Sequence, residues 1–361
     1  MMKALNFCII KIGSNVLTNV DGNPDFDRMS HLVSEIAHLK KSGVKIILVS
    51  SGAVAFGRKE ITLAERINPV TKKQIWSSTG QIELINTYKN LFANHQTQVA
   101  QILVTKEDFR DRKHFLNMKN CLLGLLEQGI LPIVNENDTV AITELMFTDN
   151  DELASLTAAM VDADSLVLLT NVNGIYTGHP DNEDSELLQV IQHQDKNLGN
   201  YITASKSSFG RGGMLTKLNM ALKAANLGIQ VFIANGKTEN IISQIHSGTA
   251  TCTYFQPQKA KQSSKKWLAH GMNYYKGAVK INKGARLALT QQKISSLLPI
   301  GIIEITGDFE KGDILRISDD TDSIIGLGRA EYSSKVAVEK VGLKNQKPLI
   351  HYNYLYIFGH E

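Results

Sequence analysis

The chain has 361 residues, enough for two domains, and its 43% hydrophobic and 20% charged residues are typical of a globular protein. This composition excludes collagen-like, low-complexity and disordered chains. The apolar run from Phe7 is cut by Lys11, far short of the ~18 residues of a membrane span, so we expect a cytoplasmic protein without membrane contact. The well-separated Cys8, Cys121 and Cys252 form no CxxC pair and predict small core residues.

Up to about residue 256, short apolar runs alternate with longer amphipathic stretches. Continuous apolarity predicts strands buried on both faces, and the alternation predicts an α/β fold with an open, mainly parallel sheet sandwiched by helices. Ligands of such folds bind beyond the carboxyl ends of the strands. The expected strands span residues 7–12, 45–49, 98–104, 131–134, 166–169 and 230–233. The expected helices span residues 27–41, 81–95, 115–128, 152–161 and 213–227.

The pattern changes at residues 257–268, a polar stretch that predicts a linker between domains of residues 1–256 and 269–361. The second domain is expected to be small and mostly β, because its apolar segments are short and separated by glycine turns. Those segments span residues 277–281, 301–306, 314–317, 324–328 and 348–352.

Basic residues gather around this boundary. Residues 257–286 contain eight Lys or Arg and no acid, so they carry +8 while the rest of the chain sums to −4. Such a block is found on nucleic-acid-binding surfaces, but a solvated linker and domain edge is the commoner origin and the one we favour.

Short motifs follow the first two expected strands. Lys11 leaves the first strand just before Gly13 and Ser14, so its ammonium group lies beside turn N–H groups that suit a phosphate. The run Ser50-Ser51-Gly52-Ala53 precedes an expected helix and lets an anionic ligand approach the backbone. Either motif alone is also typical of an ordinary turn.

Two polar loops come next, Val-Asn-Glu-Asn-Asp-Thr at 134–139 and Thr-Asp-Asn-Asp-Glu at 148–152. Carboxylates bind an ammonium group, while amides and N–H groups bind carboxylates, so the two loops together predict an amino-acid ligand. Asp149, Asn150 and Asp151 are also good helix caps, but one cap explains one acid and not two loops.

The last motifs indicate a nucleotide. The fifth expected strand runs into a turn over residues 170–176, at the edge where ligands bind. Residues 209–217, Phe-Gly-Arg-Gly-Gly-Met-Leu-Thr-Lys, form a glycine-rich loop that opens a helix. Glycines let the backbone close on phosphates, and Lys217 can follow charge onto a transferred phosphoryl group. The spacing is not that of a Walker A loop.

These motifs, in this order, resemble the amino-acid kinase family, and specifically its glutamate kinase branch. The resemblance extends over nearly the whole chain and includes Lys73-Gln74 and Gly80-Gln81. The second domain resembles a PUA domain from Lys276-Gly277 onward. The resemblance implies the amino-acid kinase fold and ATP-dependent phosphorylation of the side-chain carboxylate of L-glutamate, the first step of proline biosynthesis.

The resemblance also implies residue roles. Lys11 and Lys217 would stabilise the phosphoryl group in transfer, and Asp151 would orient both lysines. The residues implied in glutamate binding are Ser51, Gly52, Asn135, Asp138, Asp149 and Asn150. The residues implied in ATP binding are Lys11, Gly13, Thr170, Asn171, Arg211, Gly212, Gly213, Met214, Leu215, Thr216 and Lys217.

Three positions depart from the family pattern: Asn171 replaces an expected Asp, Arg211 a common Thr, and Leu215 a common small residue. The first removes a charge near the nucleotide and the second adds one, so we expect nucleotide affinity to differ while the phosphoryl-transfer residues are unaffected.

The cofactor expected is Mg²⁺, arriving with ATP, because no cluster of carboxylates or histidines marks a dedicated metal site. The resemblance further implies a homo-oligomer inhibited by proline.

Two alternatives for the function stay open. One is another kinase of the family, acting on aspartate, N-acetylglutamate, carbamate or a nucleotide. The other is an RNA-binding or RNA-modifying protein that acts through the second domain.

Overall fold

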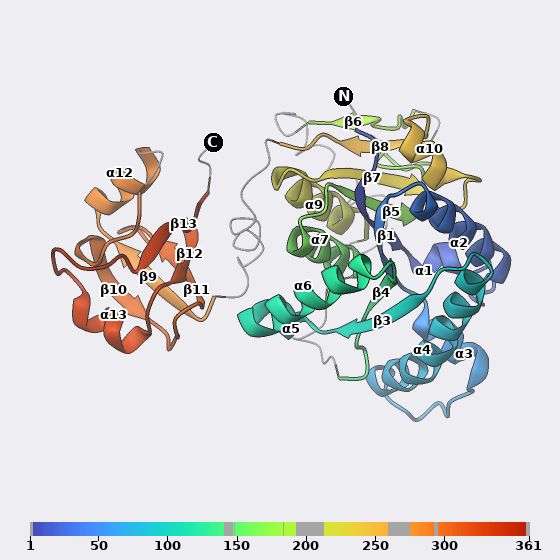
Figure 1. Ribbon diagram of the computed structural model, residues 1–361, viewed down its shortest axis with the longest axis horizontal. Coiled ribbons are helices and arrows are strands. Elements are labelled where there is room, and N and C mark those ends of the chain that lie inside the picture. Colours follow the sequence, from blue (N-terminus) through green and yellow to red (C-terminus); the bar gives the residue numbers. More distant parts are fainter. Residues whose placement is uncertain are drawn as a thin grey trace. The chain divides into compact units, whose positions relative to one another are not determined.

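The computed structural model describes residues 3–140, 147, 149–182, 184–192, 213–258, 275–291 and 295–358. The chain divides into two compact units, Met1–Asp108 with Asn117–Ala260 and Phe109–Leu116 with Lys261–Glu361. Each is built on its own sheet (Figure 1). Most of the expected linker, residues 259–268, lies outside the described residues. Among the described helices, none is long and apolar enough to cross a membrane.

The first unit has an eight-stranded sheet in the order β3-β4-β2-β1-β5-β7-β8-β6. Its strands are β1 (Phe7–Ile12), β2 (Lys45–Ser50), β3 (Val99–Val104), β4 (Leu131–Glu136), β5 (Ser165–Thr170), β6 (Val190–Ile191), β7 (Gln230–Asn235) and β8 (Cys252–Phe255). From β3 to β7 all pairings are parallel, whereas β8 runs antiparallel to β7 and pairs in parallel with β6. The mainly parallel sheet and its six expected strands are confirmed. The short β6 and β8 were not expected.

The helices of this unit lie on both faces of the sheet, with α2, α4 and α10 on one face and α7 and α9 on the other (Figure 1). Their bounds are α1 (Ser14–Leu17), α2 (Phe26–Lys41), α3 (Ala53–Glu60), α4 (Pro69–Ala93), α7 (Asn150–Val161), α9 (Gly213–Asn226) and α10 (Ile241–Ser247). Helices α5 (Lys106–Arg110) and α6 (Arg112–Glu127) belong to it in part, because Phe109–Leu116 is assigned to the second unit. This arrangement places the start of α7 and the start of α9 near the carboxyl edge of the central strands.

Helix α4 begins twelve residues earlier than expected. The side chain of Asn68 caps it by accepting from the Thr71 N–H, and Pro69 occupies the first turn, where a missing N–H costs nothing. Gly80 lies inside the helix because α3 passes too close for a side chain: a Cβ there would lie 1.9 Å from the Ala53 carbonyl oxygen. The expected start at residue 81 was therefore wrong.

A large core cluster of the first unit lies between one face of the sheet and helices α2, α4 and α10. Ile10, Leu48 and Phe232 are fully buried members of the core on the face covered by α2 and α4. Cys8 and Cys252 are buried as expected, but Cys121 is exposed on α6, so its assignment to the core was wrong. Position 121 alone does not reveal which side of an amphipathic helix a small residue occupies.

The second unit has a five-stranded sheet in the order β10-β9-β11-β12-β13. Its elements are β9 (Gly277–Ile281), α12 (Lys283–Gln291), η2 (Pro299–Gly301), β10 (Ile302–Thr306), β11 (Ile314–Ser318), β12 (Ile324–Ala330), α13 (Ser334–Lys340) and β13 (Ile350–Ile357). The small, mostly β architecture is confirmed, with two helices that were not expected. Its separate core includes Val279, Phe309 and Leu315.

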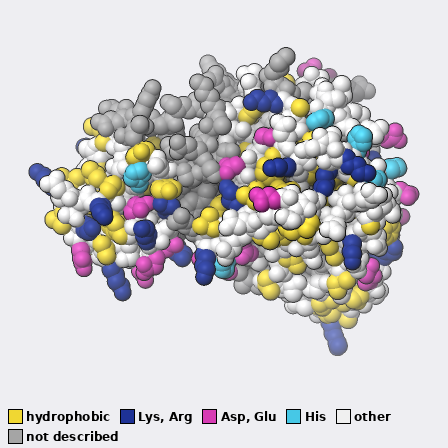
Figure 2. Space-filling view, in the orientation of Figure 1, with side chains coloured by type: hydrophobic (Ala, Val, Ile, Leu, Met, Phe, Trp, Pro, Cys, Tyr) yellow, Lys and Arg dark blue, Asp and Glu magenta, His cyan; other side chains and the backbone are white. Residues whose placement is uncertain are grey.

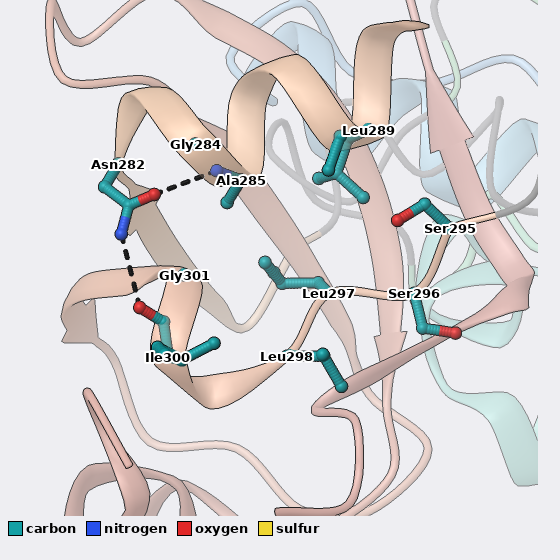
Figure 3. A pocket seen from close by; sticks show the side chains of 11 residues that line it. Asn282, Gly284, Ala285, Leu289, Ser295, Ser296, Leu297, Leu298, Ile300 and Gly301 are labelled. Carbon is teal, nitrogen blue, oxygen red and sulfur yellow. Dashed lines mark hydrogen bonds between the residues drawn. The ribbon is translucent and has the colours of Figure 1, made fainter. Parts of the chain in front are cut away.

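A pocket of about 310 Å³ lies between α12, η2 and the segment at 295–298 (Figure 3). Its lining is mainly aliphatic, with Leu289 and Leu297 among its residues. The polar Asn282 is already used: its Oδ1 accepts from the Ala285 N–H at 2.8 Å and its Nδ2 donates to the Ile300 carbonyl at 3.2 Å. Among the described residues that line it, none is charged.

Candidate active site

Two lysines from distant parts of the sequence share one carboxylate. Lys11 Nζ, at the end of β1, lies 2.6 Å from Asp151 Oδ1, and Lys217 Nζ, in the second turn of α9, lies 2.7 Å from Asp151 Oδ2. The Asp151 side chain is fully buried and the side chains of Lys11 and Lys217 are 6% and 15% exposed. The three groups together carry one surplus positive charge, held in a fixed geometry for an anion.

Burial and the two lysines act on Asp151 in opposite directions. Burial raises the pKa of its carboxyl, but the two ammonium groups outweigh burial and hold that pKa below its usual value. Asp151 is therefore an anion at neutral pH. Without it, two ammonium groups would face one another with little solvent to screen them.

On the preceding residue, the side chain of Asn150 connects the ends of two strands, β2 and β4. Its Nδ2 donates to Ser51 Oγ at 2.7 Å, to Asn135 Oδ1 at 3.2 Å and to the Ser50 carbonyl at 3.2 Å. Asn135 in turn donates to Gln81 Oε1 at 2.8 Å. The structure thus brings together Ser51, Asn135 and Asn150, which the resemblance implied in glutamate binding.

Asp138 lies just beyond β4 and is held by α4. Lys73 Nζ lies 2.8 Å from its Oδ1, and Ser77 Oγ donates to its Oδ2 at 2.7 Å. The backbone continues this contact, because Gln74 Nε2 donates to the Thr139 carbonyl at 3.0 Å. The side of α4 that carries Lys73, Ser77 and Gln81 therefore lines the loop after β4.

Asp149 caps the N-terminus of α7. Its Oδ1 accepts from the N–H groups of Asp151 and Glu152 at 3.0 and 3.1 Å, so it is the N-cap of α7. Burial, and next the charge of Asp151, raise the pKa of Asp149. The capping role that the sequence suggested for this residue is therefore present.

The residues implied in nucleotide binding are divided between two strand ends and one helix. Gly13 donates to the Leu169 carbonyl at 3.2 Å, which ties the end of β1 to the end of β5, where Thr170 is buried and Asn171 exposed. Gly213 opens α9. Of the side chains that follow in that helix, Met214 is buried and Leu215 and Thr216 are half-buried. Arg211 and Gly212 lie outside the described residues.

Gly52 adopts a left-handed conformation, with φ +108°, where the chain turns from β2 into α3. A side chain at this position is strained whatever the space around it. The turn therefore requires glycine on backbone grounds, besides its implied role beside the substrate.

Sequence reasoning assigned no role to Lys73, Ser77 or Gln81. Their spacing of four residues places them along one side of α4. This polar stripe in the sequence indicates that one side of the helix makes polar contacts. Only the packing of α4 against the loop after β4 shows what those contacts are.

The carboxylates of the site do not form a metal-binding group. The described residues contain no cluster of three or more His, Cys, Asp or Glu that could hold a metal ion, and both oxygens of Asp151 face lysines. These residues do not fit a protein-held Mg²⁺.

The basic block has a different environment. Of its eight cations, the four that the structure describes each pair with a separate aspartate of the second unit. The pairs are Lys276 with Asp313, Lys280 with Asp322, Lys283 with Asp320 and Arg286 with Asp319, at 3.4, 2.9, 3.9 and 2.9 Å. On the face drawn in Figure 2, the Lys and Arg side chains of this unit lie among acidic and apolar ones.

Comparison with known proteins agrees with this geometry. Residues 6–235 match the amino acid kinase family and residues 277–351 match the PUA domain. The glutamate 5-kinase of Bacteroides thetaiotaomicron is 50% identical over 351 residues, 96% of this chain and 97% of that protein. The glutamate 5-kinase of Chlorobaculum tepidum is 48% identical over 350 residues, 97% of this chain and 96% of that protein.

A solved structure supports the fold. The carbamate kinase from Giardia lamblia bound to AMP-PNP superposes with a TM-score of 0.51 at 18% identity, covering 71% of this chain and all of that one. The match to the family, the sheet order and the near full-length relatives lead to one conclusion: the chain belongs to the amino acid kinase family, in the branch of the glutamate 5-kinases, and carries a C-terminal PUA domain.

Proposed function

We propose that this protein transfers the γ-phosphoryl group of Mg-ATP to the side-chain carboxylate of L-glutamate, giving L-glutamyl 5-phosphate. The observation that carries the proposal is the buried Lys11–Asp151–Lys217 group, whose surplus positive charge suits a phosphoryl group in transfer. The identity with glutamate 5-kinases over nearly the whole chain supports glutamate as the acceptor.

The reaction needs charge neutralisation more than proton transfer. The side-chain carboxylate is already ionised at neutral pH, so one of its oxygens can attack the γ-phosphorus without a general base. The bond between that phosphorus and the β–γ bridging oxygen breaks, and ADP leaves with the electron pair. Lys11 and Lys217 would bind the phosphoryl oxygens on either side, and Asp151 would keep both lysines oriented. Magnesium enters as part of the substrate Mg-ATP.

The polar loops suit the acceptor. Ser51, Asn135 and Asn150 form one hydrogen-bonded group beside the lysines, and Asp138 offers a carboxylate for the substrate ammonium. Gly52 and Asp149 complete the proposed glutamate site. The proposed ATP site comprises Lys11, Gly13, Thr170, Asn171 and residues 211–217.

The test is a hydroxylamine-trapping assay with Mg-ATP and three acceptors, L-glutamate, L-aspartate and N-acetyl-L-glutamate. We expect hydroxamate from glutamate and little from the other two, because aspartate is one methylene shorter and the acetamide lacks the positive charge that Asp138 would bind. Comparable turnover of glutamate and N-acetylglutamate would contradict the assignment.

The two alternatives are weaker. Other acceptors within the family are disfavoured by the near full-length identity to glutamate 5-kinases. An RNA function is disfavoured by the same identity, and each of the four described cations of the basic block already has an aspartate partner that offsets its charge.

Three further proposals remain. A cytoplasmic location is proposed from the sequence, and a homo-oligomer and inhibition by proline are proposed from the resemblance. The domain bounds proposed are 1–256 for the kinase, 257–268 for the linker and 269–361 for the PUA domain. Gel filtration with light scattering, and glutamate titrations with and without proline, test the second and third.

A further inference from the structure

The contact between Lys73 and Asp138 is a second place in the kinase unit where a lysine meets a carboxylate. Asp138 is held through both oxygens, by Lys73 Nζ at 2.8 Å and by Ser77 Oγ at 2.7 Å. Both partners come from consecutive turns of α4, so the carboxylate cannot rotate without losing one of them.

Neither charged group is used up by this contact. An ammonium group has three donors, and Lys73 spends one on Asp138, while each carboxylate oxygen can accept a second hydrogen bond. The Lys73 side chain is 42% exposed and that of Asp138 is 13% exposed. A positively charged group with unused donors therefore lies beside a negatively charged group with unused acceptor capacity.

This arrangement is complementary to the head group of an α-amino acid, in which an ammonium and a carboxylate share one carbon. Asp138 can accept from the ammonium while Lys73 donates to the carboxylate. An acceptor that lacks either charge would leave one member of the pair without its second partner, and such a loss is a strong source of discrimination.

The pair is also connected to the phosphoryl-transfer group. Asp138 follows Asn135 by three residues, and Asn135 accepts from Asn150, the residue before Asp151. Gln81, two turns after Lys73 on α4, accepts from Asn135 Nδ2. Helix α4 thus links the Lys73–Asp138 pair to the hydrogen-bonded Asn135 and Asn150, and Asn150 directly precedes Asp151 in the chain. The two carboxyl ends of glutamate can therefore be divided between this pair and the lysines at Asp151.

We propose that Lys73 binds the α-carboxylate of the substrate and that, with Asp138, it selects the α-amino-acid head group. This inference rests on the proposed glutamate kinase activity and adds a specificity-determining residue to it. The competing view is that Lys73 only ties α4 to the loop after β4, and the two views differ in what they predict for substrate analogues.

The experiment compares L-glutamate with L-isoglutamine, which keeps the ammonium and the side-chain carboxylate but replaces the α-carboxylate with a neutral amide. Steady-state ADP release is measured for the wild type, for Lys73→Met and for the matched control Lys72→Met. Lys72 lies on the same helix, and its side chain makes no described contact with Asp138. Thermal unfolding of each variant checks that it is folded.

We expect Lys73→Met to lower kcat/KM for glutamate by about 10- to 100-fold, mainly through KM, and to change kcat/KM for isoglutamine by less than about threefold. Lys72→Met should leave both substrates within about twofold of wild type. If isoglutamine is bound but not turned over, its inhibition constant against glutamate replaces kcat/KM and should likewise be unchanged in Lys73→Met.

An equal loss with both substrates would overturn the inference and leave Lys73 as a structural tie. An equal loss of kcat/KM in Lys72→Met would show that the effect comes from removing any positive charge from α4, and would also count against the inference. If Lys73→Met does not fold, Lys73→Arg is the second variant. It keeps the positive charge and should keep the preference for glutamate over isoglutamine. Loss of that preference in a folded Lys73→Arg would also count against the inference. Absence of glutamate-dependent ADP release in the wild type would instead refute the proposed activity.

Discussion

Lysines are arranged differently in the two units. In the kinase unit, Lys11 and Lys217 share the single carboxylate of Asp151 and are almost fully buried, which leaves one positive charge unmatched. In the second unit, each described cation of the basic block has an aspartate of its own. The described half of the denser run of positive charge is therefore matched by aspartates, and two lysines 206 positions apart form the anion site.

The largest effect should come from removing the shared carboxylate. Asp151→Asn leaves two buried ammonium groups facing each other, and breaking a buried ion pair in this way costs roughly 3–5 kcal/mol of unfolding free energy. Urea unfolding at pH 7 measures the loss. A loss no larger than that of a surface pair would show that Lys11 and Lys217 do not depend on Asp151.

The same variant has a defined pH dependence. Because the folded state lowers the pKa of Asp151, this carboxylate contributes stability that is fully present above its unfolded pKa of about 3.9 and is lost as pH falls through the lower folded value. The difference between wild type and Asp151→Asn should therefore be constant from about pH 5 to 7 and shrink below about pH 4. Urea unfolding across this range is the check, and a difference that grows on acidification would contradict the assigned sign.

Removing one of the two lysines should lower kcat more than it weakens the binding of ATP. Lys217→Met is expected to lower kcat by about 10² or more while KM for ATP changes little, since charge on the phosphoryl group peaks in the transition state. Lys223→Met, on an exposed position of the same helix, is the matched control and should be active. If KM for ATP rose while kcat held steady, Lys217 would be a binding residue only.

A small effect is expected in the second unit. Arg286→Gln should change the affinity for RNA by less than about threefold and leave the salt dependence unaltered, because the Asp319 carboxylate already matches this charge. Filter binding over a salt series measures both. A fall of about one in the slope of log affinity against log salt would show that Arg286 contacts a phosphate.

The smallest effect should follow removal of the second unit. A chain ending at Pro257 keeps Lys11, Asp151 and Lys217 and is expected to retain kcat within about threefold, since domains of this size commonly fold independently. Hydroxamate formation by the shortened chain is the measurement. A folded but inactive product would show that the second unit completes the active site.

The sequence indicated most of the architecture because continuous apolar runs identify strands buried on both faces. It missed β8, whose four residues Cys252–Phe255 are too few for a clear pattern, and it began α4 late because Gly80 resembles a helix boundary. Burial of one residue on an amphipathic helix was also misjudged at Cys121. These errors concern short elements and single positions, where local preference is weakest.

The site was predictable only where a motif of the family marked its residues. Lys11, Asp151 and Lys217 came from the family resemblance, and the structure brings their charged groups together. Lys73 and Ser77 were not assigned, because their contact with Asp138 spans more than sixty residues and depends on how α4 packs against the loop after β4. No local pattern encodes such a contact.

If a carboxylate oxygen of glutamate attacks the γ-phosphorus beside the two lysines, that oxygen must pass to the phosphoryl group, and its transfer can be followed with an isotope. Glutamate labelled with ¹⁸O in its side-chain carboxylate is incubated with Mg-ATP, and the phosphate released when the acyl phosphate cyclises or is cleaved at its carbonyl is examined by ³¹P NMR. We expect one ¹⁸O atom in that phosphate for the wild type and at least about 10²-fold slower formation of the labelled product by Lys217→Met. Phosphate without ¹⁸O, released at the same rate by both proteins, would contradict it.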